Sequence, residues 1–277
     1  MRIATWNVNS IRTRKAFVID FLHNADIDVV LMQETKCRDD QFPLEDFERA
    51  GYEVAHFGLN QWNGVGIASR LPLHDIEQGF PGMPGFTKNP AEDPATEARA
   101  ISASVDGVRL CSVYVPNGRA LDDPHLDYKI RWLEALGEHY RSYQEQQGAL
   151  PVAIGGDFNV APLDSDVGDP AFLAPGTTHT SERERTALHA FLQRAGLHDT
   201  VRPLVPTGYT YWDYKQGKFP KDHGMRIDFI FGSESFASQV THASIERDQR
   251  QGDGPSDHVP VVVEVGAEDD FDRPMVF

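Results

Sequence analysis

An Asp-Gly turn between two apolar runs constrains the fold of this chain more than any other feature. Residues 98–105 and 108–115 are largely apolar, and Asp106-Gly107 separates them. This dipeptide is typical of the tight turn of an antiparallel hairpin. Further strand-like runs cover residues 2–8, 28–34, 64–70, 152–154, 226–231 and the segment after 258, and helical patterns cover 11–23, 126–147 and 186–195. Antiparallel pairs mixed with helices favour an α+β fold over a doubly wound parallel sheet.

The apolar run at residues 152–154 ends in Gly-Gly-Asp-Phe-Asn. The two glycines free the backbone to turn. Alternation along an extended chain places the side chains of Asp157 and Asn159 on one face and Phe158 on the other. A carboxylate and an amide would then project together from a rigid support, as a phosphate-handling site requires. An ordinary strand followed by an Asp/Asn-rich turn explains this segment equally well.

Other predicted strands also end in polar residues. Asn7 ends the first strand, Glu34 follows the second, and Tyr114 ends the second strand of the hairpin. Taken alone, Glu34 is more typical of a solvated loop, and Tyr114 of an aromatic residue at a sheet margin. Asn7 and Glu34 at the ends of adjacent strands, on the same edge, would favour a shared site.

Asp228 lies among alternating apolar residues in a predicted strand. A buried carboxylate is costly without a partner, so another group must satisfy it. His258 follows Ser256-Asp257 where the closing strand begins. Its ring could donate one N–H to Asp228 and aim the other nitrogen at a reacting phosphate. A single histidine is more often a hydrogen-bonded structural residue.

Two segments combine aromatic and basic residues. Residues 209–221 contain four aromatic residues within six positions, followed by lysines. Such a pattern can stack bases while neutralising phosphates, but core and loop residues produce it as readily. Likewise, Tyr128 and Lys129 in the longest helical pattern belong either to a solvated face or to a rim that faces phosphate.

The composition excludes several classes of protein. The 277 residues carry a net charge of −16, which argues against a protein that coats nucleic acid by bulk electrostatics but not against a nuclease with a local basic rim. With only two cysteines, Cys37 and Cys111, a disulfide scaffold and a zinc site are not expected. No apolar run approaches membrane-spanning length, and the first strand begins at Arg2. We therefore expect a cytoplasmic protein without a membrane partner.

Six motifs, in order along nearly the whole chain, resemble exonuclease III and the related apurinic/apyrimidinic endonucleases. Parts of the set also occur across the wider endonuclease/exonuclease/phosphatase superfamily. The motifs are Trp6-Asn7-Val-Asn9, Leu31-Met-Gln-Glu34-Thr-Lys36, Tyr114-Val-Pro-Asn117-Gly, Gly156-Asp157-Phe-Asn159-Val-Ala-Pro, Arg226-Ile-Asp228 and Ser256-Asp257-His258.

The resemblance implies a four-layered α/β/β/α sandwich of two mixed β-sheets with flanking helices. We expect one such domain over residues 1–266 and a solvated acidic tail over 267–277. The resemblance also implies that Glu34 is the principal ligand of Mg²⁺ or Mn²⁺, with Asn7 and Asp257 beside it. Carboxylate and amide oxygens suit such hard ions.

The remaining site residues take their roles from the same resemblance. His258 with Asp228 would contact the scissile phosphate, and Tyr114 and Asn159 would orient the phosphate and the nucleophile. Asp157 would activate the attacking water or protonate the leaving oxygen. In relatives, three positions hold a flipped-out abasic sugar, and the matching residues here are Tyr211, Met225 and Ile227. Several relatives carry Trp at the position of Tyr211.

The predicted function is therefore a metal-dependent DNA repair nuclease. It would hydrolyse the phosphodiester 5′ to abasic sites and trim 3′ ends as a 3′→5′ exonuclease. Its partner would be double-stranded DNA with abasic sites or blocked 3′ ends, and it would act as a monomer. The alternative is another phosphoesterase of the superfamily, such as a phosphoinositide phosphatase, a sphingomyelinase or an RNA nuclease. A binding module without catalysis is disfavoured because Glu34, Asp157, Asn159, Asp228 and His258 are all intact.

Overall fold

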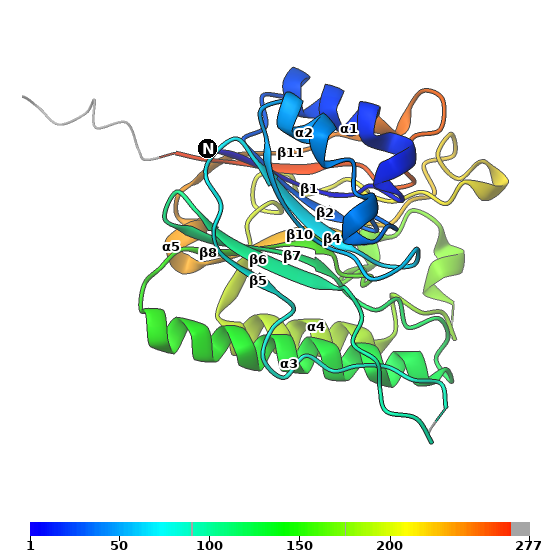
Figure 1. Cartoon of the computed structure of the whole chain (residues 1–277). Helices are drawn as coiled ribbons and strands as arrows, with labels where there is room; N and C mark the ends of the chain where they lie inside the picture. The colour runs from blue at the N-terminus through cyan, green and yellow to red at the C-terminus, as the bar shows by residue number, and fades with distance from the viewer. Residues whose placement is uncertain (90, 175, 267–277) are drawn as a thin grey trace, which may run out of the picture.

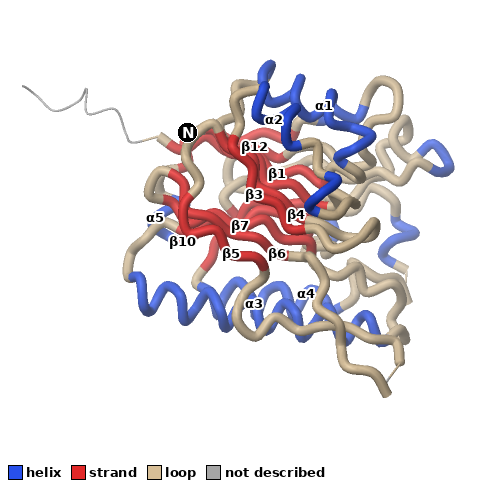
Figure 2. Tube along the Cα trace, in the orientation of Figure 1, coloured by secondary structure: helices blue, strands red, loops and turns tan. Residues whose placement is uncertain are grey.

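The computed structural model describes residues 1–89, 91–174 and 176–266, so the predicted acidic tail lies outside the described residues. Two six-stranded sheets pack face to face, and helices cover both outer faces (Figure 1). Figure 2 shows the two layers of strands between the two layers of helices. The predicted α+β class and the four-layered sandwich of mixed sheets are confirmed.

The first sheet has the strand order β11-β12-β1-β2-β4-β3. β1 and β2 are parallel, whereas β12 and β4 run antiparallel to them. Helices α1 and α2 cover this sheet. The bounds are β1 Arg2–Asn7, α1 Ile11–Asn24, β2 Val29–Gln33, α2 Leu44–Arg49, β3 Glu53–Phe57, β4 Val65–Ser69, β11 Val240–Ile245 and β12 Val261–Val265.

The second sheet has the order β5-β6-β7-β8-β10-β9. The predicted hairpin is β6-β7, and β7 and β8 are parallel. Helices α3 and α4 cover its outer face. The bounds are β5 His74–Gln78, β6 Ala100–Val105, β7 Val108–Tyr114, α3 Pro124–Gln147, β8 Val152–Asp157, α4 Glu182–Ala195, β9 Leu197–Asp199, β10 Asp228–Ser233 and α5 Glu234–Ala237. Short 3₁₀ turns occupy Asp39–Gln41, Asp164–Asp166, Pro170–Leu173, Lys215–Gly217 and Arg247–Arg250.

The central strands read as continuous apolar runs because they are buried on both faces. In β2, Val29 and Leu31 belong to the core between the sheets, whereas Val30 and Met32 belong to the core under α1 and α2. The helices over the second sheet bury a third apolar cluster. Gly155 faces the first sheet, where a Cβ atom would lie 2.7 Å from Leu31 Cδ1, so glycine is needed for close packing of the two sheets.

Several elements differ from the sequence-based prediction. The strand expected over 226–231 begins only at Asp228, and β3, β5, β9, β11 and α2 were not predicted. β5 is an edge strand that is mostly exposed, so it lacks the apolar alternation from which strands are predicted. The α4 helix ends as expected at Gly196, whose φ is 58°. Among the described residues, no helix is long and apolar enough to span a membrane.

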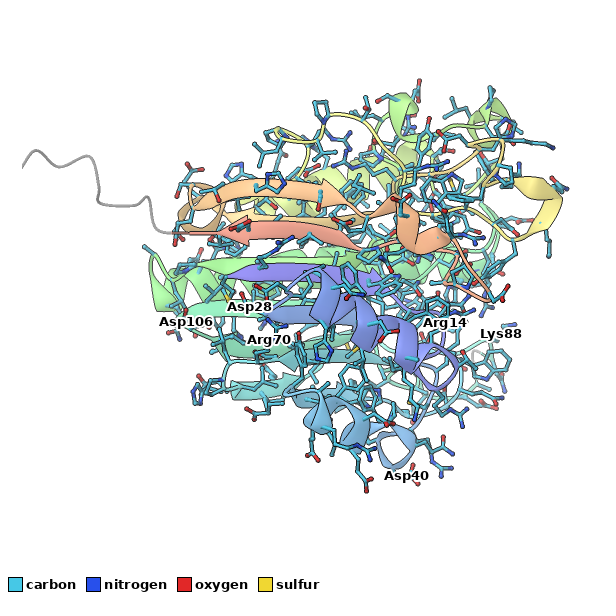
Figure 3. All side chains as sticks on the ribbon, turned by 90° about the horizontal axis from the view of Figure 1, so that it is seen from above. Arg14, Asp28, Asp40, Arg70, Lys88 and Asp106 are labelled. Atoms are coloured by element: carbon cyan, nitrogen blue, oxygen red, sulfur yellow. The ribbon has the colours of Figure 1, made fainter. Side chains whose placement is uncertain are left out.

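The strand directions bring the polar strand ends to one edge of the sandwich. β1, β2, β7 and β8 end there, and β10 begins there. The Asp106 hairpin turn lies at the opposite end of β7. Figure 3 accordingly shows Asp28 and Asp106 at one end of the molecule and Arg14 and Lys88 at the other. The loops at the second end surround the site described next.

Candidate active site

The core of the site is built from the ends of adjacent strands. In the second sheet, Tyr114, Asp157 and Asp228 are register partners on three neighbouring strands. In the first sheet, Asn7 ends β1 beside Gln33, the last residue of β2. The next residue, Glu34, has a φ of 52°, so the chain turns sharply there. The two sheets therefore bring amide, phenol and carboxylate groups to one edge.

Asn7 connects the two sheets through a single amide group. Its Nδ2 atom donates to Glu34 Oε1 at 2.8 Å and to Asp157 Oδ2 at 3.0 Å. Its main-chain carbonyl accepts a hydrogen bond of 2.7 Å from the buried Ser256 hydroxyl. That contact holds the Ser256-Asp257-His258 turn against β1. The predicted motifs thus meet in space, although Asn7 and His258 are 251 positions apart in the sequence.

His258 is held by Asp228, as expected for a buried carboxylate that needs a partner. Its Nδ1 atom lies 2.9 Å from Asp228 Oδ2, which also accepts a hydrogen bond of 2.6 Å from the Thr210 hydroxyl. The other ring nitrogen, Nε2, faces the site and lies 3.8 Å from Asp157 Oδ2. The Asp228 contact therefore fixes the ring so that Nε2 points at the position of a substrate.

The electrostatics of this group favour proton exchange near neutral pH. Burial lowers the pKa of His258, but the charges of Asp228 and Asp157 outweigh it and raise the pKa to about 10. The ring is therefore protonated and can donate from both nitrogens. Burial, with the charges of Asp228 and Glu34, raises the pKa of Asp157 to about 7 against the effect of His258. A carboxyl group with such a pKa can give or accept a proton under physiological conditions.

The surroundings of Glu34 fit a cation. Carboxylate oxygens of Glu34 and Asp157 lie within 4.8 Å of each other. Lys36 Nζ already contacts Glu34 Oε2 at 2.6 Å, and although burial raises the pKa of Glu34, Lys36 and Asn7 outweigh it and lower the pKa. Asp257 lies outside that close group but lines the same cavity. The cavity is lined by four carboxylates, those of Glu34, Asp157, Asp213 and Asp257. Carboxylates provide the hard oxygen donors that Mg²⁺ and Mn²⁺ prefer.

A second wall of the cavity consists of amides and a histidine. Asn159 donates from Nδ2 to the Val115 carbonyl at 3.0 Å, and its Oδ1 accepts from Asn117 Nδ2 at 3.0 Å. His179 Nε2 lies 3.1 Å from the same Oδ1 atom. Burial and the nearby Lys129 charge lower the pKa of His179 to about 4, so its ring is neutral near pH 7.

Tyr114 completes the polar part of the cavity. Burial and the charge of Glu34 raise the pKa of its hydroxyl well above the ordinary value, so the phenol remains a neutral hydrogen-bond donor. The Arg99 guanidinium lies over its ring, 4.9 Å from the centroid. This packing fixes the direction of the hydroxyl.

The three residues predicted to hold an abasic sugar form an apolar patch of the same cavity. Met225 and Ile227 are buried against Ala161, and Tyr211 packs on them. The Tyr211 ring centroid lies 4.8 Å from that of His258. The cavity has a volume of about 440 Å³ and is also lined by Glu34, Asp157, Asn159 and His258. The structure therefore brings the predicted polar and apolar residues together.

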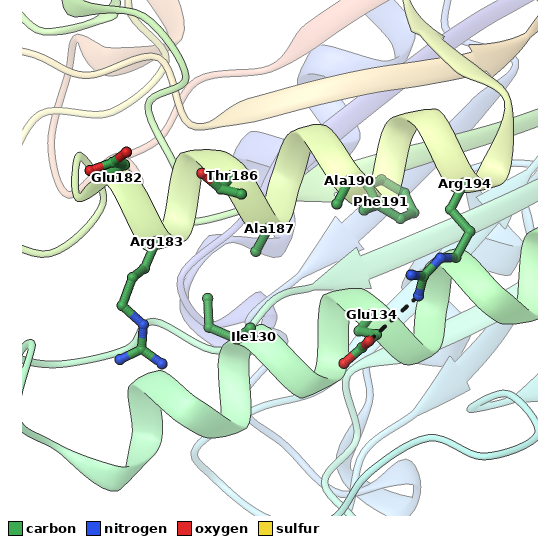
Figure 4. A pocket seen from close by; sticks show the side chains of 9 residues that line it. All are labelled: Ile130, Glu134, Glu182, Arg183, Thr186, Ala187, Ala190, Phe191 and Arg194. Carbon is green, nitrogen blue, oxygen red and sulfur yellow. Dashed lines mark ion pairs between the residues drawn. The ribbon is translucent and has the colours of Figure 1, made fainter.

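Another cavity, of about 450 Å³, lies between α3 and α4 (Figure 4). Its lining is formed by apolar residues such as Ile130 and Ala187, with Arg194 and Glu134 paired at one end. None of the predicted site residues lines it. The chemistry therefore belongs to the cavity at the sheet edge.

The structure decides two alternatives that the sequence left open. Tyr128 and Lys129 are both fully buried, so neither belongs to a solvated face or to a rim that faces phosphate. In the aromatic segment, Trp212 is buried and packs edge-on against Phe219, whereas Tyr214 is 49% exposed. That segment is therefore part core and part exposed loop.

Sequence reasoning missed two contributions to the site. His179 precedes α4 in a Thr- and Ser-rich stretch that contains no motif, so nothing in the sequence indicates its position. Lys36 is the last residue of the Glu34 motif, but no role of its own was predicted for it. Its ammonium also donates to Asn9 Oδ1 at 2.6 Å, and Asn9 donates to Asp257 Oδ1 at 2.8 Å. A chain of polar contacts thus links Glu34 to Asp257.

A fold of two facing sheets with this set of groups at one edge defines an enzyme that hydrolyses phosphoesters. The sequence profile of the Endonuclease/Exonuclease/phosphatase family matches residues 4–258, and the chain belongs to this family.

Proteins with similar sequences or structures identify the group of nucleases within this family. An exodeoxyribonuclease of Bacillus subtilis is 30% identical over 94% of this chain and 98% of its own length. The structure of the 3′ phosphatase NExo from Neisseria, bound to a product DNA hairpin, is 35% identical, covers 96% of this chain and 100% of its own, and has a TM-score of 0.87. An AP endonuclease from Archaeoglobus fulgidus is 32% identical with a TM-score of 0.85, over 96% of this chain and 100% of its own. The chain is a divalent-metal-dependent nuclease of this group.

Proposed function

We propose that this enzyme repairs DNA by hydrolysing the phosphodiester 5′ to abasic sites and by removing nucleotides and blocking groups from 3′ ends. The observation that carries the proposal is the position of His258 Nε2, 3.8 Å from Asp157 Oδ2, in the cavity that Glu34 also lines. A charged donor, a carboxyl group that titrates near neutral pH and a hard-ion ligand are the groups that phosphodiester hydrolysis requires.

Each residue has a role that follows from its surroundings. His258, charged and fixed by Asp228, donates from Nε2 to a phosphate oxygen on which negative charge develops. Asp157 takes a proton from the attacking water or gives one to the leaving oxygen. The Tyr114 hydroxyl and the Asn159 amide orient the phosphate and the nucleophile. None of these steps requires a covalent intermediate.

Glu34, with Asn7 and Asp257, would hold the metal. The fit rests on the donor set, since Glu34 and Asp257 both offer carboxylate oxygens in the cavity. For Asn7 to ligate the ion, its amide would turn so that Oδ1, which accepts from the Asn9 main-chain N–H at 3.1 Å, faces the cation. We propose Mg²⁺ or Mn²⁺, which when bound would act as a Lewis acid on the phosphate.

The apolar patch of Tyr211, Met225 and Ile227 supports the choice of abasic DNA. An abasic nucleotide has no base to unstack, so its extrusion from the duplex costs little. A pocket too small for a base would convert that difference into selectivity. We also propose a monomer, since one chain supplies every group of the site. A cytoplasmic location agrees with two buried cysteines that form no disulfide.

Cleavage of defined duplexes tests the proposal. One duplex carries a single abasic analogue, one carries a 3′ phosphate and one is undamaged with a recessed 3′ end. We expect metal-dependent cleavage 5′ to the analogue and release of 3′ groups from the others. Absence of cleavage at the analogue by an enzyme that processes 3′ ends would refute the abasic-site part. Inactivity on all DNA would refute the function itself.

Met225→Ala tests whether the apolar patch selects the lesion. The variant enlarges the patch and should raise cleavage of undamaged DNA relative to abasic DNA. Leu133→Ala is the matched control, because Leu133 is also buried but belongs to α3 and does not line the cavity. Each truncation should cost about 2–5 kcal/mol of stability, so rates are compared at equal folded fraction. An unchanged ratio in Met225→Ala would place lesion choice elsewhere.

A further inference from the structure

An ion pair between Lys129 of α3 and Glu184 of α4 lies completely inside the molecule. The two charged groups are 2.6 Å apart, and both side chains have 0% exposure. Neither residue lines the active-site cavity. Moving two charges out of water is costly, and a buried ion pair rarely stabilises a fold more than apolar residues of similar size. Stability alone therefore does not explain the pair.

The remaining hydrogen bonds of the pair go to the backbone and side chains of three separate segments. Lys129 Nζ donates to the Asn159 carbonyl at 2.6 Å and lies 3.3 Å from the Asn117 carbonyl. Glu184 accepts from the Thr178 hydroxyl at 2.8 Å and from the Ser181 hydroxyl at 2.6 Å. The pair thus connects the loop after β7, the loop after β8 and the segment that precedes α4.

The same three segments supply one wall of the cavity. Asn117, Asn159 and His179 come from these segments in turn, and their side chains contact one another at 3.0–3.1 Å. Asn159 has a φ of 52° and His179 a φ of 73°, conformations that non-glycine residues adopt only with support from their surroundings. Lys129 and Glu184 supply contacts of that kind directly behind the wall.

We infer that Lys129 and Glu184 are positioning residues, which set the placement of Asn117, Asn159 and His179 against the substrate from behind the active site. This inference rests on the proposed nuclease function. A displacement of about 1 Å in such groups can lower a rate by about 10²-fold. The pair should therefore affect kcat although neither residue touches the cavity.

The double variant Lys129→Met/Glu184→Leu separates positioning from stability. Each single change leaves an unpaired buried charge and should lower the melting temperature. The double variant removes both charges, so its melting temperature should recover toward that of the wild type. Its kcat on the 3′-phosphate duplex should remain about 10-fold or more below the wild-type value, with little change in KM, because no donor reaches the two carbonyls.

Arg109→Met provides a matched control. Arg109 is buried on β7, contacts Glu77 at 3.2 Å, and lies five residues from Tyr114, roughly 16 Å along the strand. Its replacement should lower the melting temperature while kcat stays at the wild-type value. A folded double variant with wild-type kcat would overturn the inference.

Glu184→Gln gives the same test if the double variant does not fold. The amide keeps the size of the side chain but removes its charge, which loosens the hold on Lys129. A folded Glu184→Gln protein with unchanged kcat would also overturn the inference. A wild-type enzyme that cleaves no DNA would count instead against the proposed function, so the two failures are distinguishable.

Discussion

Replacing Asp228 by Asn should neutralise His258 without changing the shape of its surroundings. Asp228 Oδ2 lies 2.9 Å from His258 Nδ1, and its side chain is completely buried. The amide of Asn has the same size but carries no charge. Burial, which favours the neutral ring, would then be opposed mainly by Asp157. We expect the pKa of His258 to fall well below its wild-type value of about 10.

The size of the effect follows from the pKa of His258. One pKa unit corresponds to about 1.4 kcal/mol, so the rise from 6.5 to about 10 represents roughly 5 kcal/mol of preference for the charged ring. The contact with Asp228 is shorter than the 3.8 Å contact with Asp157, so Asp228 supplies the larger share. Below about pH 6.5 the wild-type His258 ring is charged in both the folded and the unfolded state. In that pH range, Asp228→Asn should lower the free energy of unfolding by about 2–4 kcal/mol.

The sign of the pH dependence is fixed by the raised pKa. The pKa of His258 is higher in the folded state than its ordinary value of 6.5, so protonation of the ring stabilises the folded wild type. This stabilisation is complete below pH 6.5 and is lost as the pH rises through about 10. The difference in unfolding free energy between the wild type and Asp228→Asn should be largest near about pH 6 and should shrink toward higher pH. The cleavage rate of the variant should fall by about 10²-fold or more, because a neutral ring stabilises the phosphate charge less.

Three measurements test this reasoning in protein treated with EDTA. NMR titration of the His258 ring gives its pKa in both proteins, and denaturant unfolding at several pH values gives the free-energy difference. Single-turnover cleavage after addition of metal gives the rate. A His258 ring that remains protonated at about pH 9 in the variant, or a difference in stability that grows with pH, would refute the assignment of Asp228 as its main partner.

Three further substitutions have expected outcomes. Asp157→Asn should lower the single-turnover rate by about 10²-fold or more while the unfolding curve stays cooperative, because the group acts in proton transfer; a folded variant with a normal rate would contradict this role. Glu34→Gln should shift the metal concentration for half-maximal activity upward more than it weakens DNA binding in EDTA, and an unchanged midpoint would reject Glu34 as principal ligand. Gly156→Ala should destabilise the protein by about 3 kcal/mol, since its Cβ would lie 1.9 Å from the Val113 carbonyl oxygen; chemical denaturation measures this, and a loss below about 1 kcal/mol would show that β7 and β8 can separate there.

The fold was predictable where burial leaves a clear pattern in the sequence. β2 is apolar on both faces, and the hairpin has its turn at Asp106-Gly107. β5 was missed because an exposed edge strand needs no apolar residues. The start of the strand at Asp228 rather than Arg226 depends on the partner strand, since β10 pairs with β8 from Asp228 onward. No local pattern contains that information.

The site was predictable where the type and burial of a single residue demand a particular partner. A buried carboxylate among apolar residues needs a hydrogen-bond partner. This requirement at Asp228 led to the prediction of its contact with His258. The burial of Lys129 was not predictable, because its partner Glu184 is 55 residues away and a helical lysine is usually solvated. The contact of His179 with Asn159 likewise depends on the path of a loop without a motif. Tertiary contacts alone decide such placements.

The site lies where the edges of the two sheets meet. The distance between the sheets therefore sets the distances between its functional groups. Asn7 ends β1 and Glu34 directly follows β2 in one sheet, whereas Asp157 and Asp228 lie on β8 and β10 of the other. Gly155, two residues before Asp157, packs closely on Leu31 and Thr5 of the first sheet and so sets this spacing. A Cβ atom added at Gly155 would lie 2.7 Å from Leu31 Cδ1 and 3.2 Å from Thr5 Cβ. Hydrostatic pressure, or a bulkier residue anywhere in the layer between the sheets, would move the two halves of the site relative to each other. Substitutions along this layer should therefore alter turnover even where they lie far from the cavity.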